Sequence, residues 1–475
     1  MTHRSEYDGV IVGSGPNGLA AAIVLARAGL SVLVLEAQEH IGGGTRSDAL
    51  TLPGFTHDVC SAVHPMAVAS PFLRTLPLND HGLEWVYPQY PLAHPFDDGS
   101  VAVLKHSIEE TCQLLGVDGN SYKGLVGPLV AKWAFLEQYV LAPISIPRQP
   151  LFMARFGIHA IKPASRLAKS YFKSEPARAL FAGLAAHSLM PLESWGTSAV
   201  GLVLAALAHV SGWPIAKGGS QQIADALASY LRSIGGEIVT GVRVRSRNEL
   251  PPSKVVLCDL SPRGLLQIAG ESFPVSYYRA LERYQYGPGV FKVDWALRGP
   301  IPWTSRQCAQ AGTVHLGGTL SEIALSERDS CGNGPSEYPF VLLAQPSVID
   351  PSRAPAGCHT AWAYCHVPSG STLDMTGRIE AQVERFAPGF RDLILARSTK
   401  SPTQLEAENS NLVGGNITGG ANSLRQLFFR PTCQLYETPV KGLFLCSAST
   451  PPGAGVHGMC GYHAAMRALA SIQLL

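Results

Sequence analysis

The chain has 475 residues, which is too long for one simple hydrophobic core and predicts two domains. Hydrophobic residues make up 46% of the chain and charged residues 15%, so we expect a large buried core and exclude intrinsic disorder. The 37 Lys and Arg residues nearly balance the 35 Asp and Glu residues, which argues against a nucleic-acid-binding protein.

The first predicted elements are a strand, a glycine-rich turn, a helix and a second strand. Residues 7–12 are mostly apolar and lead into Gly13-Ser14-Gly15-Pro16-Asn17-Gly18. An Ala-rich helix follows over 19–28, and a strand over 30–35 ends at Glu36. G-x-G-x-x-G in this context indicates a dinucleotide-binding Rossmann unit and disfavours the alternative of a purely structural turn.

Each motif residue has a chemical reason. Gly13 makes the tight turn, Gly15 lets the backbone approach a pyrophosphate, and Gly18 lets the helix pack close to the strand. The N-terminus of the helix offers unpaired N–H groups to the phosphates. Glu36 can accept hydrogen bonds from a ribose, and its charge disfavours the 2′-phosphate of NADP.

The residues after Glu36 carry a family resemblance. Gly42-Gly43-Gly44-Thr45-Arg46-Ser47 is similar to a segment of the FAD-binding fold shared by amine oxidases and phytoene desaturase-like carotenoid oxidoreductases. In that family an acid is followed by a double glycine and a Ser or Thr along the FAD pyrophosphate. The resemblance implies FAD contacts from Ala37, Gly43, Gly44, Thr45 and Arg46. The alternative for Arg46 is a surface salt bridge.

Two later regions extend the resemblance. A Gly-Gly-Ser sequence at 218–220 precedes a predicted helix over 221–234 and a strand over 235–242, which implies a backbone contact from Val242 to the adenine. Only 12 residues (243–254) separate this strand from the next, over 255–258, so the β-hairpin of many relatives is expected to be trimmed.

The C-terminal region resembles the carotenoid-oxidoreductase ending, in which a strand, a Pro-Gly-rich loop and a final helix meet the isoalloxazine. We expect the strand over 442–448 and the helix through 472. The resemblance implies FAD contacts from Ser449, Gly455, His457, Gly458 and Met459. His457 is also the candidate catalytic residue, as a hydrogen-bond donor or proton shuttle. The alternative for His457 is a loop residue bonded to a backbone carbonyl.

The predicted fold is α/β. A Rossmann-type FAD-binding domain, resembling that of glutathione reductase, is expected from 1–74, 211–274 and 436–475. A discontinuous α+β substrate domain is expected from 75–210, largely helical, and 275–435. The glycine-rich segment 414–420 lacks the strand-before, helix-after context of a second nucleotide site.

Other sequence features mainly exclude functions. The ten cysteines contain no C-x-x-C pair, so we expect reduced thiols in a cytosolic protein and no zinc ribbon, and no metal site is predicted. Residues 1–7 contain no hydrophobic stretch, so no secretory signal is expected.

These observations predict an FAD-dependent oxidoreductase that transfers hydride between an apolar, isoprenoid or lipid-like small molecule and flavin N5. Two alternatives remain open, a flavin-dependent polyene isomerase and a flavin-bearing scaffold protein with little turnover. The electron acceptor stays open between oxygen and a quinone.

The segment 148–178 stands out by charge. It contains seven basic residues and one acid, Glu175, interleaved with large apolar residues such as Leu151, Ile158, Leu167 and Phe172. This pattern predicts peripheral contact with an anionic membrane. The alternative is a helix with a solvated basic face that covers the substrate domain.

Overall fold

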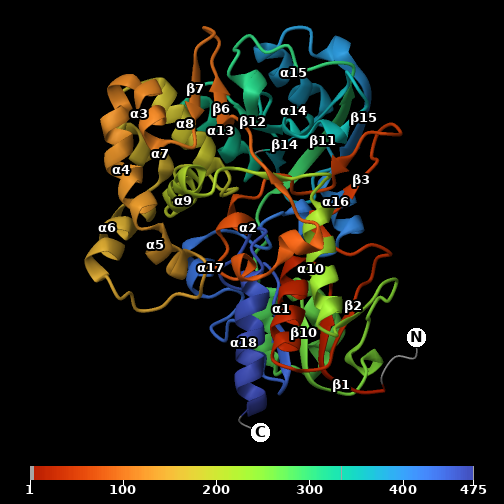
Figure 1. Cartoon of the computed structure of the whole chain (residues 1–475). Coiled ribbons are helices and arrows are strands. Elements are labelled where there is room, and N and C mark those ends of the chain that lie inside the picture. Colours follow the sequence, from red (N-terminus) through yellow and green to blue (C-terminus); the bar gives the residue numbers. More distant parts are fainter. Residues whose placement is uncertain (1–4, 333, 474–475) are drawn as a thin grey trace.

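The computed structural model describes residues 5–332 and 334–473, so residues 1–4 of the predicted N-terminal domain lie outside the described part. Two sheets organise the chain (Figure 1). One is a five-stranded parallel sheet with the order β16-β10-β1-β2-β9, and the other is a seven-stranded mixed sheet with the order β15-β11-β14-β13-β12-β6-β7. The predicted α/β class, with a Rossmann-type sheet and a separate mixed sheet, is confirmed.

Apolar strands covered on both faces build the parallel sheet. Its strands are β1 (Tyr7–Val12), β2 (Val32–Leu35), β9 (Glu237–Val239), β10 (Ser253–Cys258) and β16 (Leu443–Leu445). One face packs against helices α1 (Pro16–Arg27), α10 (Gln221–Ser233) and α18 (Met459–Gln473), and the other against α11 (Pro262–Ala269) and α12 (Val275–Glu282). Burial on both faces explains the uninterrupted apolar runs at 10–12 in β1 and 255–258 in β10.

The second sheet also lies between two cores. Its strands are β6 (Tyr90–Pro95), β7 (Val101–Leu104), β11 (Gly289–Leu297), β12 (Ala311–Leu316), β13 (Val341–Ala344), β14 (His359–Val367) and β15 (Ile394–Lys400). The outer face packs against α15 (Thr376–Phe386). The inner face packs against α8 (Glu175–Ala186), α9 (Thr197–Val210) and α13 (Leu320–Ser330). Strands β6 and β7 come from the segment predicted to be largely helical, because pairing with β12 extends the sheet into it.

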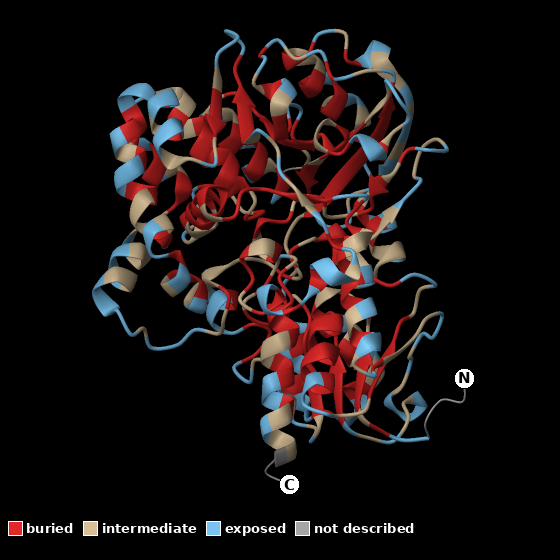
Figure 2. Cartoon of the chain, viewed as in Figure 1, coloured by how far each residue is buried: buried red, intermediate tan, exposed pale blue. Residues whose placement is uncertain are grey.

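Smaller elements complete the fold, and exposed residues gather on its outer helices (Figure 2). The helices are α2 (Pro65–Ala69), α3 (Ile108–Leu114), α4 (Gly119–Ala131), α5 (Trp133–Val140), α6 (Pro150–Ala160), α7 (Ala164–Tyr171), α14 (Pro346–Ile349), α16 (Pro402–Glu408) and α17 (Leu424–Phe428). The two-residue strands are β3 (Ser47–Asp48), β4 (His57–Asp58), β5 (Trp85–Val86) and β8 (Ile215–Ala216).

The predicted strand over 235–242 is shorter than expected. Strand β9 ends at Val239 because Gly241, with φ +72°, turns the chain and the Val242 N–H donates to the Glu36 carbonyl at 2.8 Å. Between β9 and β10 the chain forms a loop with one short 3-10 turn (Arg247–Glu249), so no hairpin occurs there.

Buried charges connect the two sheets. Arg353, which follows α14, forms an ion pair with Asp58 of β4, and both side chains are at most 1% exposed. Asp58 also accepts from the Ser220 N–H at 2.8 Å, at the start of α10. Lys292 and Asp294 form another buried ion pair, but both belong to β11 and so lie within the mixed sheet. The bonds of Asp58 to Arg353 and to the Ser220 N–H join the segment after α14 to the start of α10.

Candidate cofactor and substrate cavity

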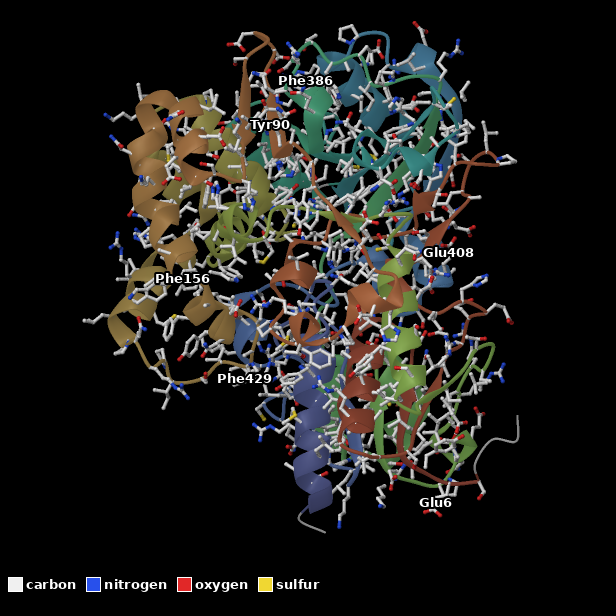
Figure 3. The ribbon with its side chains drawn as sticks, in the orientation of Figure 1. Glu6, Tyr90, Phe156, Phe386, Glu408 and Phe429 are labelled. Atoms are coloured by element: carbon white, nitrogen blue, oxygen red, sulfur yellow. The ribbon has the colours of Figure 1, made fainter. Side chains whose placement is uncertain are left out.

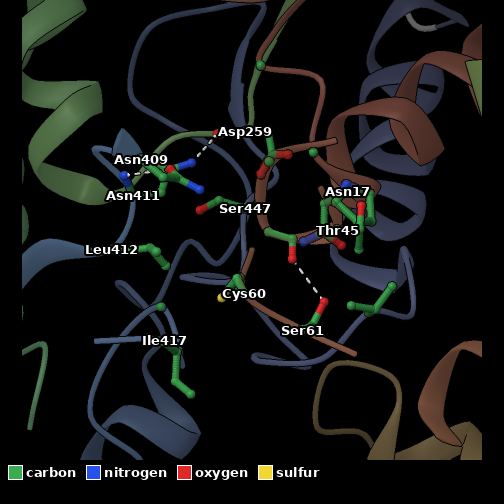
Figure 4. A pocket seen from close by; sticks show the side chains of 18 of the residues that line it. Asn17, Thr45, Cys60, Ser61, Asp259, Asn409, Asn411, Leu412, Ile417 and Ser447 are labelled. Carbon is green, nitrogen blue, oxygen red and sulfur yellow. Dashed lines mark hydrogen bonds between the residues drawn. The ribbon is translucent and has the colours of Figure 1, made fainter. Parts of the chain in front are cut away.

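A cavity of about 680 Å³ lies between the two sheets (Figure 4). One part of its lining lies at the carboxyl end of the parallel strands, where ligands bind in open α/β sheets. We call this part the nucleotide end. The other part, the substrate end, lies against the inner face of the mixed sheet.

Most of the residues predicted to bind cofactor line this cavity. They are Gly13, Ser14, Gly15, Pro16, Asn17, Glu36, Ala37, Gly43, Gly44, Thr45, Arg46, Val242, Ser449 and Gly455. Gly18, His457, Gly458 and Met459 do not line it.

Glu36 is held in place by backbone and side-chain donors. Its Oε2 accepts from the Ser14 N–H at 2.8 Å and from the Ser14 hydroxyl at 2.6 Å. Its Oε1 accepts from the Gln38 N–H at 2.9 Å. A carboxylate oxygen accepts about two hydrogen bonds, so Oε1 retains capacity for a donor in the cavity, such as a ribose hydroxyl.

Glycines form a close-fitting cradle beside the start of α1. A Cβ on Gly15 would lie 2.6 Å from Asp259 Oδ2, and one on Gly43 would lie 3.2 Å from the Gly15 Cα. No side chain caps α1 at Gly15, and the buried Asn17 Oδ1 has no partner among the described residues. Backbone that any side chain would block, together with the uncapped N-terminus of α1, fits the pyrophosphate of a dinucleotide. The Asn17 Oδ1 is an acceptor and would need a donor such as a hydroxyl group.

Asp259 is a cavity residue that the sequence analysis missed. It directly follows β10, and its Oδ2 accepts from the Gly18 N–H at 3.0 Å. Burial raises the pKa of Asp259 to about 7, although the Gly18 N–H opposes this shift. The sequence did carry a signal for Asp259, because an acid directly follows an apolar strand. In a parallel sheet the carboxyl end of that strand, β10, lies at the same edge as the carboxyl end of β1, where the glycine-rich turn begins.

Arg46 is one of three arginines in the cavity lining, with Arg243 and Arg245. Its Nε donates to the Gly43 carbonyl at 3.1 Å, and the half-buried side chain lines the cavity. Among the described residues it forms no ion pair, so the alternative of a surface salt bridge has no partner here. The Thr45 hydroxyl beside it donates to the Gly42 carbonyl at 2.8 Å.

The C-terminal loop divides into lining residues and supporting residues. The Ser449 hydroxyl donates to the Gly419 carbonyl at 2.7 Å at the cavity wall. The His457 ring is buried behind the wall, and its Nδ1 accepts from the Met459 N–H at 3.0 Å at the start of α18. Burial lowers the pKa of His457 to about 4. A Cβ on Gly458 would lie 3.0 Å from the Ala20 Cβ, so this glycine allows the loop to pack on α1.

Aromatic side chains dominate the substrate end. Trp362 and Tyr364 lie on the same face of β14 and stack with ring centroids 5.6 Å apart and an interplanar angle of 12°. Trp213 and the apolar side chains Leu189, Leu204, Leu342 and Ile417 complete the wall. The sequence analysis did not identify these residues, because strand pairing brings them together from distant segments.

Two further groups lie at or behind this wall. Lys292 Nζ sits 5.2 Å from the centroid of the Trp362 ring while paired with Asp294. Cys60 lines the cavity, and burial raises the pKa of its thiol, which disfavours the reactive thiolate. The ten cysteines are all free, and no His, Cys, Asp or Glu cluster in the described part of the chain could hold a metal ion.

Comparisons with known proteins agree with this geometry. The model of an NAD(P)-binding Rossmann-like domain matches residues 11–75. A pyridine nucleotide-disulfide oxidoreductase domain-containing protein 2 from Rattus norvegicus is 28% identical, covering 97% of this chain and 93% of that protein. A lycopene-forming phytoene desaturase from Pantoea ananas is 25% identical, covering 95% and 96%. The crystal structure of an oxidoreductase from Methanosarcina mazei superposes with a TM-score of 0.67 at 16% identity, covering 97% and 100%.

The likeness therefore extends over nearly the whole chain and includes both the glycine-rich turn and the two-sheet architecture. It confirms the resemblance predicted from the sequence: over nearly its whole length the chain is similar to the phytoene desaturases.

Proposed function

We propose that the protein binds FAD noncovalently and transfers hydride between flavin N5 and an apolar, isoprenoid or lipid-like substrate. One observation carries the proposal: a single cavity connects the dinucleotide-binding edge of the parallel sheet to an aromatic, apolar wall. A cofactor bound at the first end would present its ring to a substrate at the second.

The nucleotide end supplies a group for each part of the ADP moiety. Glu36 would accept from the ribose, the start of α1 would face the pyrophosphate, and Arg46 would contact a phosphate. The Val242 N–H is already bonded to Glu36, which leaves its carbonyl for the adenine. When bound, FAD supplies the hydride acceptor or donor, which protein side chains lack.

The substrate end would orient an apolar molecule and exclude water. Trp213, Trp362 and Leu204 present hydrophobic surface to the cavity. Such a wall suits hydride transfer, which needs little acid–base help from side chains. A thiol–disulfide mechanism is disfavoured, because Cys60 is the one cysteine of the cavity lining and is unpaired.

The test begins with cofactor identity. We expect the purified protein to be yellow and to release FAD, rather than FMN or NAD, on denaturation. Anaerobic bleaching of the flavin is then measured against isoprenoids, fatty acyl compounds and amines. Product mass separates desaturation, which removes two hydrogens, from isomerisation, which removes none. Absence of bound flavin would contradict the proposal, and flavin that no probe reduces would favour the scaffold alternative.

We also propose that the helical side of the molecule contacts an anionic membrane. Three large apolar side chains are exposed on this side: Ile158, Ile161 and Trp195. The Gly196 N–H donates to the Ile161 carbonyl at 2.7 Å, so the segment that contains Trp195 lies beside the end of α6. A Cβ on Gly196 would lie 3.1 Å from Leu424, the first residue of α17.

Further apolar residues extend this surface at the end of α17. Leu427, Phe428 and Phe429 are each more than half exposed. Phe156 and Phe429 lie on this side of the molecule (Figure 3). The basic side chains Arg155, Arg166, Lys169 and Lys173 are exposed on or directly after α6 and α7.

The structure corrects part of the sequence-based interpretation of this segment. Leu167 and Phe172, expected among the membrane-facing residues, are buried in the core under α8 and α9. Within the described residues, no helix combines the length and apolar character needed to cross a bilayer. Contact would therefore be interfacial, with each basic residue near the surface contributing about 1 kcal/mol.

Liposome co-sedimentation tests this contact. We expect binding to anionic vesicles at low salt, weaker binding at high salt, and loss of binding when Arg155, Arg166, Lys169 and Lys173 are changed to Glu. Changing four exposed basic residues outside this segment, Arg247, Arg279, Arg283 and Lys441, to Glu is the charge-matched control. A wild-type protein that stays in the supernatant with anionic vesicles at low salt contradicts the proposal.

A further inference from the structure

We propose that His187 and Tyr364 form a neutral hydrogen-bonding pair that recognises an oxygen atom of the substrate. The substrate would then be a lipophilic molecule with a carbonyl or hydroxyl group, not a plain hydrocarbon. This inference rests on the proposed function and specifies the substrate class of the same cavity.

Tyr364 presents its phenol to the cavity. It lies on the inner face of the mixed sheet, in register with Leu342 on one side and Lys292 on the other. The side chain is partly accessible and lines the cavity, and its hydroxyl has no hydrogen-bond partner among the described residues. Lys292 cannot supply that bond, since its ammonium is paired with Asp294 over the Trp362 ring.

His187, just after α8, presents the second group. It lines the cavity, is half-buried, and its ring centroid lies 6.0 Å from that of Trp213. Its Nε2 lies 3.1 Å from the Nε2 of the fully buried His315, so one proton joins the two rings. Tyr364 packs against the apolar cluster that contains Leu189, two residues after His187.

The surroundings of His315 determine which ring donates. The Nδ1 of His315 is buried and has no hydrogen-bond partner among the described residues. It packs against Gly183, and a Cβ added to Gly183 would lie 2.6 Å from this nitrogen. An unpaired buried N–H is rarer in proteins than an unpaired acceptor. We therefore assign the shared proton to the His315 Nε2, which leaves His187 with its proton on Nδ1. His187 is then a donor toward the cavity.

The substrate end has no charge to pair with a charged substrate. Burial, with a smaller effect from His366, lowers the pKa of His187 to about 3, and burial raises the pKa of Tyr364, so both groups are neutral at physiological pH. The side chains around them, including Trp213, Leu342 and Trp362, are uncharged. Two neutral donors in an apolar wall favour a neutral oxygen acceptor over an ammonium group.

Binding of a matched set of C15 probes tests the inference. Farnesene, farnesol, farnesal and farnesylamine are titrated anaerobically into the flavin-loaded protein, and dissociation constants are read from tryptophan fluorescence and flavin absorbance. We expect the alcohol and aldehyde to bind about tenfold more tightly than the hydrocarbon, and the amine more weakly than the alcohol.

Variants connect this preference to the two residues. Tyr364→Phe and His187→Phe are each expected to reduce the ratio of the farnesene to the farnesol dissociation constant about 3- to 10-fold. His187→Asn, which keeps an N–H donor, should restore part of it. Tyr338→Phe, at an exposed tyrosine outside the cavity lining, is the matched control.

The outcomes separate this inference from the proposed function. Equal wild-type affinity for farnesene and farnesol overturns the inference, as does a Tyr364→Phe variant that weakens all four probes equally. Flavin content is measured in the same samples. A preparation without flavin that still prefers oxygenated probes would overturn the proposed function and leave oxygen recognition standing.

Discussion

The two ends of the cavity are built in opposite ways. At the nucleotide end, backbone and small residues such as Gly15 and Gly43 leave room for a ligand to approach the main chain. At the substrate end, large side chains such as Trp213 and Trp362 form the wall. A ligand at the first end would therefore contact mainly the main chain. The second end can change its specificity through side-chain replacement without disturbing the fold.

The largest expected effect comes from disturbing the backbone packing that supports the nucleotide end. A Cβ on Gly18 would lie 2.1 Å from the Gly13 carbonyl oxygen, so Gly18→Ala must separate α1 from the turn. We expect loss of more than 90% of bound FAD and destabilisation of about 3 kcal/mol or more, measured by flavin content and urea unfolding. Gly124→Ala, on α4 with nothing within 4 Å of the new Cβ, is the control and should be neutral or stabilising. Normal flavin content in Gly18→Ala would contradict the assigned packing.

The second effect is a pH dependence that arises at Asp259. Its pKa is about 7 in the folded chain against an ordinary value of 3.8, because the carboxyl is buried. The folded state thus holds this proton more tightly, so stability falls as the pH rises from about 4 to 7. Asp259→Asn should remove this slope and be more stable than wild type at pH 8, by on the order of 2–4 kcal/mol, with little difference at pH 4.

Urea unfolding at several pH values measures this slope, and FAD affinity provides a second reading. A carboxylate beside the cradle would repel the pyrophosphate, so wild-type FAD binding should weaken between pH 6 and 8 while binding to Asp259→Asn stays constant. Parallel stability curves for the two proteins would remove Asp259 as the titrating group.

A smaller change concerns the ribose contact. Glu36→Ala should weaken FAD retention about 10- to 100-fold, because a charged acceptor contributes roughly 1.5–3 kcal/mol. Glu39→Ala is the matched control, since Glu39 is exposed and does not line the cavity. Equilibrium dialysis against FAD measures both, and equal retention by the two variants would contradict the role of Glu36.

The smallest effect on catalysis is expected at His457. Its ring supports the start of α18 behind the cavity, and its pKa of about 4 lies outside the range from pH 5 to 9. His457→Ala should keep FAD and the pH profile of flavin reduction while losing about 1 kcal/mol of stability. Stopped-flow measurement of the flavin reduction rate checks this. If the pH dependence of that rate between pH 5 and 9 differs between His457→Ala and the wild type, His457 takes part in catalysis.

Most of the residues that the sequence pattern singled out lie at the nucleotide end of the cavity, and none of the aromatic residues of the substrate end was among them. The turn at 13–18 and Glu36 lie within one β-α-β unit, so their spacing alone predicts their neighbours. Tyr364 and His187 meet the cavity only through strand pairing and helix packing between distant segments. Asp259 was missed for a related reason, since its position depends on β10 lying beside β1. His457 was placed by loop resemblance, which does not predict the direction of a side chain.

The buried ion pair between Arg353 and Asp58 also bears on how a substrate enters. Swinging the two sheets apart would separate Arg353 from Asp58 and hydrate groups that are now at most 1% exposed. Breaking a buried pair in this way costs about 3–5 kcal/mol, because Asp58 would keep only its hydrogen bonds to neutral donors such as the Ser220 N–H. The contact between Arg353 and Asp58 therefore opposes rotation of the two sheets relative to each other. Entry and exit must rely on local movement of loops or side chains around the cavity, with the two sheets fixed.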